Sequence, residues 1–441
     1  MRVLLINPPM PYGIKGHLQT PLGLCYLSSM IMNIAETMVF DCNVSANLEK
    51  TILSFSPDII GISILTPTYK NSIKLLNHLK NLVKKNCFFI AGGVHASLFP
   101  EEILKKGFNI VIRGEGEQVF YNVILSLAKG EHYHMLDGVS YIDYKGNIVH
   151  NREAKRIENL DSIPFPDRKD LPLSCYEHES IITSRGCCFR CFYCSSSHYW
   201  GQKIRYRSAS NVFDELSQLY KAGIKNFYFC DDNFTSSKTL VCDICNRIIS
   251  SNMNIKWTAL TRVDTIDSSL LKLMKKAGCT ILSLGIESGS NVFHRDVKKT
   301  SIETIKCAFE MIKQADIKTR TTWIIGLGKT YDDEYQSLQL IKDLLPDQVS
   351  VHCLIPFPNT EAWNEPEKYN IVIDKNNFDW DVMNMTFSPN LLDYVQFTHI
   401  SKKQIIALIE TTRTELVKYG YDGKNRKFES FLDNTIIKVI D

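Results

Sequence analysis

The chain has 441 residues, of which 44% are hydrophobic, which is enough for about three domains that each bury a core. Its formal net charge is +3, from 51 Lys and Arg against 48 Asp and Glu, which argues against the strongly basic surface that broad nucleic-acid or membrane-surface binding requires. The first apolar run ends at Pro8 and Pro9 and predicts a strand, not a signal peptide. Because no apolar stretch approaches the ~18 residues that span a bilayer, we expect a cytoplasmic protein without nucleic-acid or membrane partners.

Residues 1–130 alternate between predicted strands and helices. Short apolar runs such as VLLIN, DIIGISIL and CFFIAGG are separated by helical patterns such as GLCYLSSMIMNI and NSIKLLNHLKNLVKK. Continuous apolar strands between amphipathic helices are typical of a parallel sheet that is covered on both faces. This stretch therefore predicts a doubly wound, Rossmann-like domain.

The pattern loosens over residues 131–175, which we expect to be a linker because it holds a DYKGN turn and a Pro-rich stretch. Regular alternation resumes over residues 176–356 with six predicted strands, the first five each followed by a helix. A complete eightfold barrel needs more chain, so we predict a partial (β/α)6 barrel. Residues 357–441 are expected to form a small C-terminal segment that covers the barrel.

Four cysteines lie within eight residues after the first barrel strand, in the stretch TSRGCCFRCFYCSSS: Cys187, Cys188, Cys191 and Cys194. In a reducing compartment such a cluster suggests a metal or catalytic site before disulfides. A four-sulfur zinc site usually takes two separated pairs, and no second pair follows a neighbouring strand. The spacing suits an iron–sulfur cluster in either of two registers, CxxCxxC from Cys188 or CxxxCxxC from Cys187.

The stretch TSRGCCFRCFYC resembles the signature of radical S-adenosylmethionine (SAM) enzymes. The resemblance implies that Cys187, Cys191 and Cys194 ligate three irons of a 4Fe–4S cluster, and Cys188 stands where relatives usually have proline. SAM would chelate the fourth iron, and one electron would cleave it to methionine and a 5′-deoxyadenosyl radical. The resemblance also implies an external electron donor that is flavodoxin- or ferredoxin-like.

Later strand ends match positions where this family contacts SAM. Polar residues end the second, third and fourth predicted strands. The resemblance implies that Asp231 and Asn233 bind the ammonium group of SAM and that Arg262 binds its carboxylate. It places Glu287 and Ser288 at the ribose and amino-acid parts of SAM. Tyr193 matches the aromatic residue that precedes the last cysteine. The fifth strand ends in GLGKT where relatives typically read GLPGET, and PFPNT at 356–360 resembles a PYPGT segment.

The domain order resembles the subgroup that carries a cobalamin-binding domain. Ser63 and Leu65 form an SxL pattern, and Gly92 and Gly93 follow on the next strand; both features imply contact with the nucleotide tail of cobalamin. Relatives with a lower cobalt ligand read DxHxxG, whereas this chain reads KGHLQT. His17 is thus a candidate ligand that lacks the aspartate which would orient it.

The leading hypothesis is a cobalamin-dependent radical SAM methyltransferase that acts on an unactivated carbon of a small metabolite. One SAM would methylate cobalt, and a second would yield the radical that removes hydrogen from the substrate. The alternative is a cobalamin-free dehydratase, cyclase or lyase with an empty N-terminal domain. A transfer-RNA methylthiotransferase would need a second cysteine trio and a basic tail, and a redox or scaffold protein would need no SAM-contacting strand ends.

Overall fold

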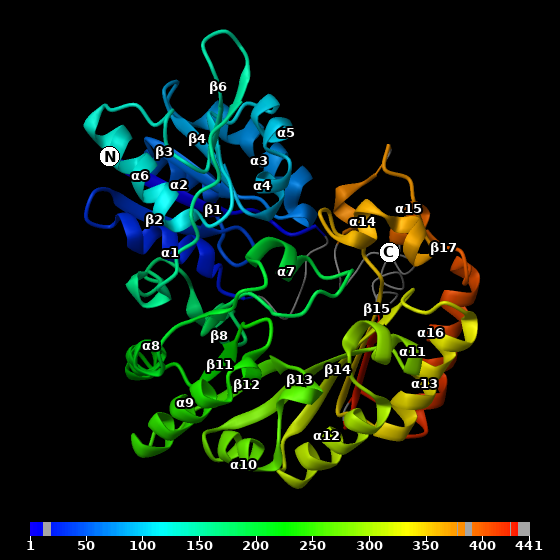
Figure 1. Ribbon diagram of the computed structural model, residues 1–441. Helices are drawn as coiled ribbons and strands as arrows, with labels where there is room; N and C mark the ends of the chain where they lie inside the picture. The colour runs from blue at the N-terminus through cyan, green and yellow to red at the C-terminus, as the bar shows by residue number, and fades with distance from the viewer. Residues whose placement is uncertain (12–18, 377, 384–389, 424, 431–441) are drawn as a thin grey trace. The chain divides into compact units, whose positions relative to one another are not determined.

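The computed structural model describes residues 1–11, 19–376, 378–383, 390–423 and 425–430. The chain divides into two compact units, Met1–Glu179 and Ser180–Asp441, and each is considered separately (Figure 1). The first unit extends beyond residue 130, where the expected domain ended.

The first unit contains a seven-stranded sheet in the order β2-β1-β3-β4-β5-β6-β7. The first five strands pair in parallel, and β6 and β7 add an antiparallel edge. The strands are β1 (Arg2–Asn7), β2 (Glu36–Asp41), β3 (Ile59–Ser63), β4 (Phe88–Gly92), β5 (Ile110–Ile112), β6 (Val139–Ile142) and β7 (Ile148–His150). The order reverses between β1 and β3, and ligands of such sheets bind at the carboxyl ends of the strands beside such a switch.

Helices cover both faces of this sheet, as Figure 1 shows for the elements coloured blue to cyan. They are α1 (Leu22–Ile31), α2 (Leu48–Phe55), α3 (Tyr69–Leu82), α4 (Val94–Leu98), α5 (Pro100–Lys105) and α6 (Gly116–Lys129). The buried apolar residues of α1 and α6 meet strand side chains such as Leu5 and Ile90 in one core. The doubly wound domain predicted from alternating apolar runs is therefore confirmed.

The segment expected as a linker is partly regular structure. The DYKGN turn joins β6 to β7, and the backbone N–H of Asp143 donates to the Asn147 carbonyl. Val139 is fully buried, so this hairpin belongs to the core of the sheet. Two short 3-10 turns follow, at Leu160–Ser162 and Leu173–Cys175. A short hairpin with only one fully buried apolar residue leaves a weak periodic signal in the sequence.

The second unit is built on a curved sheet in the order β18-β15-β14-β13-β12-β11-β8. Its strands are β8 (Glu179–Ile181), β11 (Asn226–Phe229), β12 (Lys256–Thr261), β13 (Cys279–Glu287), β14 (Lys318–Ile325), β15 (Gln348–Cys353) and β18 (Lys427–Ser430). The first six are the predicted barrel strands, so the partial (β/α)6 barrel is confirmed. The C-terminal β18, which was not predicted, pairs in parallel with β15.

Five long helices follow the strands on the outer side of this sheet: α8 (Ala209–Lys221), α9 (Lys238–Ser250), α10 (Ser268–Lys276), α12 (Ile302–Gln314) and α13 (Tyr331–Leu344). Burial alternates along β14, where Thr319, Thr321, Trp323 and Ile325 are buried and the residues between them are partly exposed. The buried set packs under the helices. Alternate residues therefore point to the inner, open side of the sheet.

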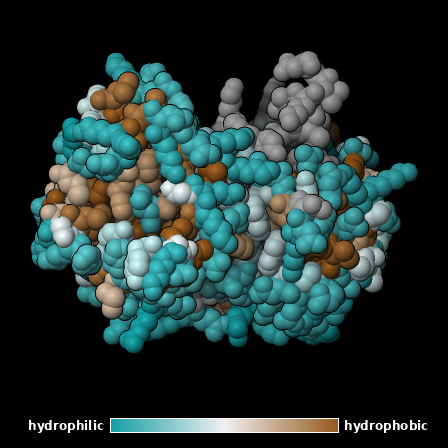
Figure 2. Space-filling view, turned by 90° about the horizontal axis from the view of Figure 1, so that it is seen from above, coloured by the Kyte–Doolittle hydropathy of each residue, from teal (hydrophilic) through white to brown (hydrophobic). Residues whose placement is uncertain are grey.

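The C-terminal segment packs on the same core as the barrel. It contains α14 (Glu361–Asn364), β16 (Ile371–Ile373), α15 (Leu391–Tyr394), β17 (Val395–Phe397) and α16 (Lys402–Val417), and β16 pairs antiparallel with β17. The face of the molecule in Figure 2 is mostly hydrophilic, with scattered hydrophobic residues. Among the described residues, no helix has the length and hydrophobicity that a membrane crossing requires.

Candidate functional site

The cysteine loop follows β9 (Ser184–Arg185), directly after the first barrel strand. Gly186 has φ +104°, and a Cβ there would lie 2.9 Å from the Lys203 carbonyl oxygen, so the turn into the loop requires glycine. The backbone N–H of Cys194 donates to the Cys191 carbonyl oxygen at 3.0 Å and closes the loop. A helix, α7 (Ser195–Trp200), begins immediately after Cys194.

The four thiols differ in their exposure. Cys188 is exposed, whereas Cys187, Cys191 and Cys194 are half-buried. Burial raises the pKa of Cys187 to about 11 and also raises the pKa of Cys194, and neighbouring thiols reinforce both shifts. Three half-buried thiols beside one thiol that is turned to solvent fit the register that begins at Cys187.

The donor set suits a cluster better than one ion. No three His, Cys, Asp or Glu side chains within the described ranges converge on a point where a single metal ion could sit. A 4Fe–4S cluster does not need such a point, because each thiolate binds a different iron. The loop therefore offers the chemistry that three iron ligands require.

Asp231 and Asp232, which follow β11, have different surroundings. Asp231 is buried and accepts hydrogen bonds from the backbone N–H of Thr183 at 3.1 Å, from the Thr183 hydroxyl at 2.9 Å and from Ser184. Burial raises its pKa to about 6, although these bonds oppose the shift. Asp231 thus holds the strand that leads into the cysteine loop, and its carboxylate is already occupied, which differs from its expected role at the SAM ammonium.

Asp232 lies beside the thiols. Its charge raises the pKa of both Cys187 and Cys194, and burial raises its own pKa while a hydrogen bond from Ser196 opposes that. Asp232 belongs to the Asp231-Asp232-Asn233 run that the resemblance places at the SAM ammonium, but only Asp231 and Asn233 were predicted as site residues. Strand alternation was the signal that could have found it, because neighbouring residues at a strand end point to opposite faces.

Arg262 reaches the cysteine loop from the end of β12. Its guanidinium lies 3.6 Å from the centre of the Phe189 ring, within that loop. It also forms a two-pronged pair with Asp264, at 2.9 and 2.6 Å, and donates to the Lys298 carbonyl oxygen at 2.7 Å. A cation is therefore held beside the cysteine loop, which is compatible with the role expected for Arg262 at the SAM carboxylate.

Glu287 ends β13 in a strained conformation, with φ +72°. Its Oε1 lies 3.6 Å from the Nζ of Lys298, a buried lysine that no sequence pattern had indicated. Burial raises the pKa of Tyr193, and the charge of Glu287 and a hydrogen bond with Cys191 add to this shift. Ser288 is buried next to it and accepts a hydrogen bond from the Ser290 backbone N–H.

Buried polar atoms without a partner gather around these strand ends. In the described part of the chain they include Asn233 Nδ2, Glu287 Oε2, His294 Nδ1 and Thr300 Oγ1. An unsatisfied buried polar atom costs about 1–3 kcal/mol, so a group of them at the ends of β11 and β13 and in the turn after β13 indicates a missing polar ligand. Asn233 and Glu287 belong to the predicted set, and their spare donor and acceptor fit the polar groups of SAM.

The carboxyl ends of β3 and β4, called the shelf below, bring together the residues predicted for the cobalamin tail in the first unit. Ser63 pairs with Gly92 at these ends, and Leu65 is 40% exposed just beyond them. Gly93 has φ +95°, and a Cβ there would lie 2.7 Å from the Ile64 carbonyl oxygen, whereas a Cβ on Gly92 would meet nothing closer than 3.9 Å. The backbone of Ile64 thus packs directly on Gly93, and Gly92 is the less crowded of the two glycines. His17 lies outside the described residues.

Comparisons with known proteins find a family for each of the two units. The family model described as the radical SAM superfamily matches residues 181–341, and the B12 binding domain model matches residues 16–124. An uncharacterized methyltransferase of Pyrococcus horikoshii, PH0819, is 33% identical over 399 residues, 85% of each chain. The anaerobic magnesium-protoporphyrin IX monomethyl ester cyclase of Rubrivivax gelatinosus is 28% identical over 84% of this chain and 73% of its own.

Two solved structures share the fold. The methyltransferase TsrM from Kitasatospora setae, with cobalamin and a 4Fe–4S cluster bound, has a TM-score of 0.73 at 17% identity and covers 86% of this chain and 78% of its own. OxsB, with aqua-cobalamin and SAM bound, has a TM-score of 0.76 at 20% identity, and the match covers 95% of this chain and 67% of OxsB. The superfamily implies a 4Fe–4S cluster and SAM as cofactors, and the B12 binding domain implies cobalamin. The chain belongs to the radical SAM superfamily, in the group whose members also carry a B12-binding domain.

Proposed function

We propose that this protein is a cobalamin-dependent methyltransferase that adds a methyl group to an unactivated carbon of a small molecule. The observation that carries the proposal is the likeness to the Pyrococcus horikoshii methyltransferase over 85% of both chains, across both domains. When bound, SAM at the cluster supplies a 5′-deoxyadenosyl radical, and cobalamin carries the methyl group.

Cys187, Cys191 and Cys194 hold the cluster in this proposal, and Cys188 does not. The different exposure of the four thiols supports the assignment. An external flavodoxin- or ferredoxin-like protein provides the electron.

Asp232 replaces Asp231 as the partner of the SAM ammonium group, because Asp232 lies beside the thiols while Oδ1 of Asp231 already accepts three hydrogen bonds. Asn233 and Glu287 use their unpartnered atoms for the polar groups of SAM. Arg262 stays the candidate for binding the carboxylate of SAM. Ser288 and Tyr193 complete the proposed SAM site.

The shelf at Ser63, Leu65, Gly92 and Gly93 receives the cobalamin tail, with no protein ligand on cobalt. Gly92→Leu tests this, because a Cβ there would meet only the Ile112 carbonyl oxygen, at 3.9 Å, and the larger side chain should block the shelf. Anaerobically prepared wild type should take up one equivalent of hydroxocobalamin, and Gly92→Leu much less. Gly23→Leu is the matched control, since Gly23 is exposed and a Cβ there would meet nothing within 4 Å.

The electron paramagnetic resonance spectrum of the cob(II)alamin form checks the cobalt ligand. It should lack nitrogen splitting from an axial imidazole. Splitting that disappears in His17→Ala would make His17 a ligand after all, and equal uptake by wild type and Gly92→Leu would remove the shelf from the proposal.

Radical cyclisation is a second candidate, which the Rubrivivax gelatinosus cyclase favours. The match to the B12 binding domain weakens the version with an empty N-terminal domain. The two reactions differ in their products from SAM. Methyl transfer yields S-adenosylhomocysteine as well as 5′-deoxyadenosine, whereas cyclisation without methyl transfer yields no S-adenosylhomocysteine.

A further inference from the structure

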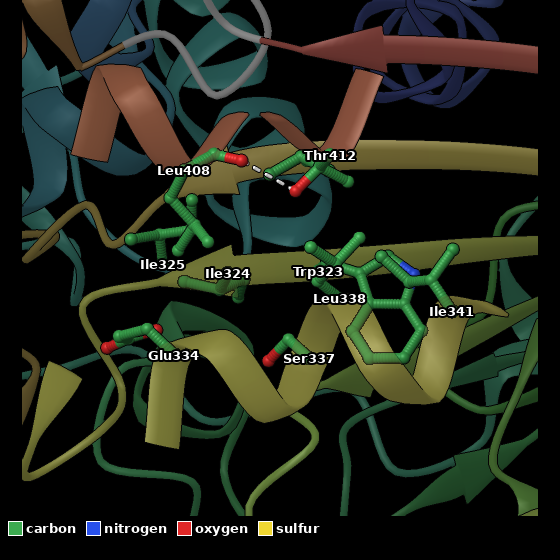
Figure 3. Close-up of a pocket in the computed structure, with 10 residues that line it drawn as sticks. Trp323, Ile324, Ile325, Glu334, Ser337, Leu338, Ile341, Leu408 and Thr412 are labelled. Carbon is green, nitrogen blue, oxygen red and sulfur yellow. Dashed lines mark hydrogen bonds between the residues drawn. The ribbon is translucent and has the colours of Figure 1, made fainter. Parts of the chain in front are cut away.

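The carboxylate of Glu334, in the first turn of α13, is almost completely enclosed, with a side chain that is 1% exposed. Its Oε1 accepts hydrogen bonds from the backbone N–H of Gly326 at 3.0 Å and of Gly328 at 2.8 Å, and lies 2.9 Å from Nε2 of His399. Figure 3 shows Glu334 at the start of α13, beside Ile325 at the end of β14. One carboxylate oxygen thus joins a strand-end loop to the C-terminal segment.

The loop that Glu334 holds is the stretch GLGKT, which departs from the GLPGET of relatives. Gly326 has φ +104°, a conformation that side chains rarely adopt. Both glycine amides point inward to the carboxylate, so Glu334 determines the course of the backbone between them. The negative charge beside this loop comes from Asp333 and Glu334 in α13, which accept hydrogen bonds from its backbone.

The C-terminal segment closes over the same loop at two points. The ring of Phe397 fills the space above Gly326, where a Cβ would lie 2.5 Å from it. Two residues later His399 reaches the carboxylate with a side chain that is 5% exposed. Its Nδ1 is buried and has no partner among the residues described, so Glu334 is the polar contact that holds the ring.

The start of α13 also holds the neighbouring strand end. The Ser290 hydroxyl donates to Asp333 at 2.8 Å, and the Gly289 backbone N–H donates to the Ser337 hydroxyl at 2.8 Å. These bonds fix the loop that begins at Glu287. A shift of this helix end would therefore move the end of β14 together with the end of β13, which carries Glu287 and Ser288 of the candidate SAM site.

We propose that Glu334 and His399 are a positioning pair through which the C-terminal segment shapes the SAM site. His399 fixes the carboxylate, and the carboxylate fixes the amides of the GLGKT loop. The inference rests on the proposed function in one respect, that SAM binds at these strand ends. It assigns neither residue a contact with SAM.

The test compares His399→Phe with His399→Gln in the cluster- and cobalamin-loaded protein. Phenylalanine fills the space of the ring but cannot donate, whereas glutamine restores a donor. Two readouts apply: the affinity for S-adenosylhomocysteine by anaerobic calorimetry, and the hydrogen exchange of the 326–330 amides without ligand. His399→Phe should lower the affinity by about tenfold, as expected for the loss of one hydrogen bond to a charged group, and speed the exchange; His399→Gln should restore most of both.

The control is Glu415→Gln, which breaks another link between the barrel and the C-terminal segment. Lys342 on α13 pairs with Glu415 on α16 at 2.7 Å, away from the loop. This variant should bind S-adenosylhomocysteine like wild type. If His399→Phe does not fold, Glu334→Gln serves in its place, because it keeps an acceptor oxygen but removes the charge. It should lower the affinity for S-adenosylhomocysteine and speed the exchange of the 326–330 amides, both to a smaller extent.

The outcomes separate this inference from the proposed function. A wild type that binds S-adenosylhomocysteine, together with a His399→Phe variant of equal affinity and equal exchange, overturns the positioning pair alone. Equal losses in His399→Phe and Glu415→Gln overturn it too, because the effect would then be a general loosening of the C-terminal segment. A wild type that binds no S-adenosylhomocysteine contradicts the assignment of SAM to these strand ends.

Discussion

The ring of Phe192, between the second and third cysteines of the cluster register, stacks on the ring of Tyr369, with centroids 3.9 Å apart and planes 2° from parallel. The Phe192 carbonyl oxygen also accepts a hydrogen bond from the Ala362 backbone N–H at 3.0 Å. The cysteine loop is therefore clamped by residues that follow the last predicted barrel strand. The C-terminal segment touches both the cysteine loop and the GLGKT loop.

Loss of this stack should loosen the cluster. Tyr369→Ala removes the ring beneath Phe192, and an aromatic pair contributes about 0.5–1.5 kcal/mol beyond its buried area. We expect faster loss of the cluster absorbance in the presence of an iron chelator. Tyr369→Phe keeps the ring and loses only the hydrogen bond from its hydroxyl to Glu361, so it should lose the cluster more slowly than Tyr369→Ala. Equal rates of cluster loss in the two variants would show that the stack does not hold the loop.

The cluster register gives a direct prediction. Cys188→Ser should keep the full iron and sulfide content, because that thiol is exposed and the other three are half-buried. Serine at Cys187, Cys191 or Cys194 should abolish the cluster absorbance. Retention in Cys187→Ser with loss in Cys188→Ser would establish the CxxCxxC register instead.

The two adjacent aspartates should respond differently to substitution. Asp231→Ala removes the oxygen that accepts the bonds from Thr183 and Ser184, so it should lower the free energy of unfolding by about 1–3 kcal/mol. Asp232→Asn should leave stability nearly unchanged and weaken SAM binding. Chemical denaturation and anaerobic calorimetry measure the two quantities, and the reverse pattern would restore Asp231 to the role expected from the sequence.

His294 predicts an acid sensitivity. Burial lowers its pKa to about 4, although its bond to the Ser288 carbonyl oxygen opposes the shift. Because the unfolded state titrates near 6.5, it binds more protons than the native state between these values, and stability is lost as the pH falls through this window. When the pH is lowered from about 7 to about 5, the urea concentration at the unfolding midpoint should fall more for the cluster-free wild type than for His294→Gln. If the urea midpoints of the two proteins fell equally with pH, this would contradict the lowered pKa of His294.

The strands and long helices of both units could be predicted because their burial follows simple periods. The alternation along β14 and the apolar run of β3 are examples. The cysteine spacing likewise indicates its own chemistry. Contacts that join distant parts of the chain leave no such period, so the pairing of β18 with β15 and the bond from His399 to Glu334 could not be foreseen.

The site was predictable to the level of strand ends but not of individual side chains. Which of Asp231 and Asp232 faces the thiols depends on the strand's rotation, and Lys298 reaches Glu287 only because of a helical turn that ends at Lys298. Such details depend on packing, which a single sequence does not specify.

The most direct test of the central claim is a count of the two products that reduced, cluster-loaded protein makes from SAM, with and without hydroxocobalamin. We predict 5′-deoxyadenosine in both samples, because radical formation needs only the cluster and SAM. We predict S-adenosylhomocysteine only with cobalamin, because methyl transfer needs an acceptor in the first unit. Production of 5′-deoxyadenosine with no S-adenosylhomocysteine at any cobalamin concentration would contradict a methyltransferase, and the absence of both products would contradict radical SAM chemistry in this protein.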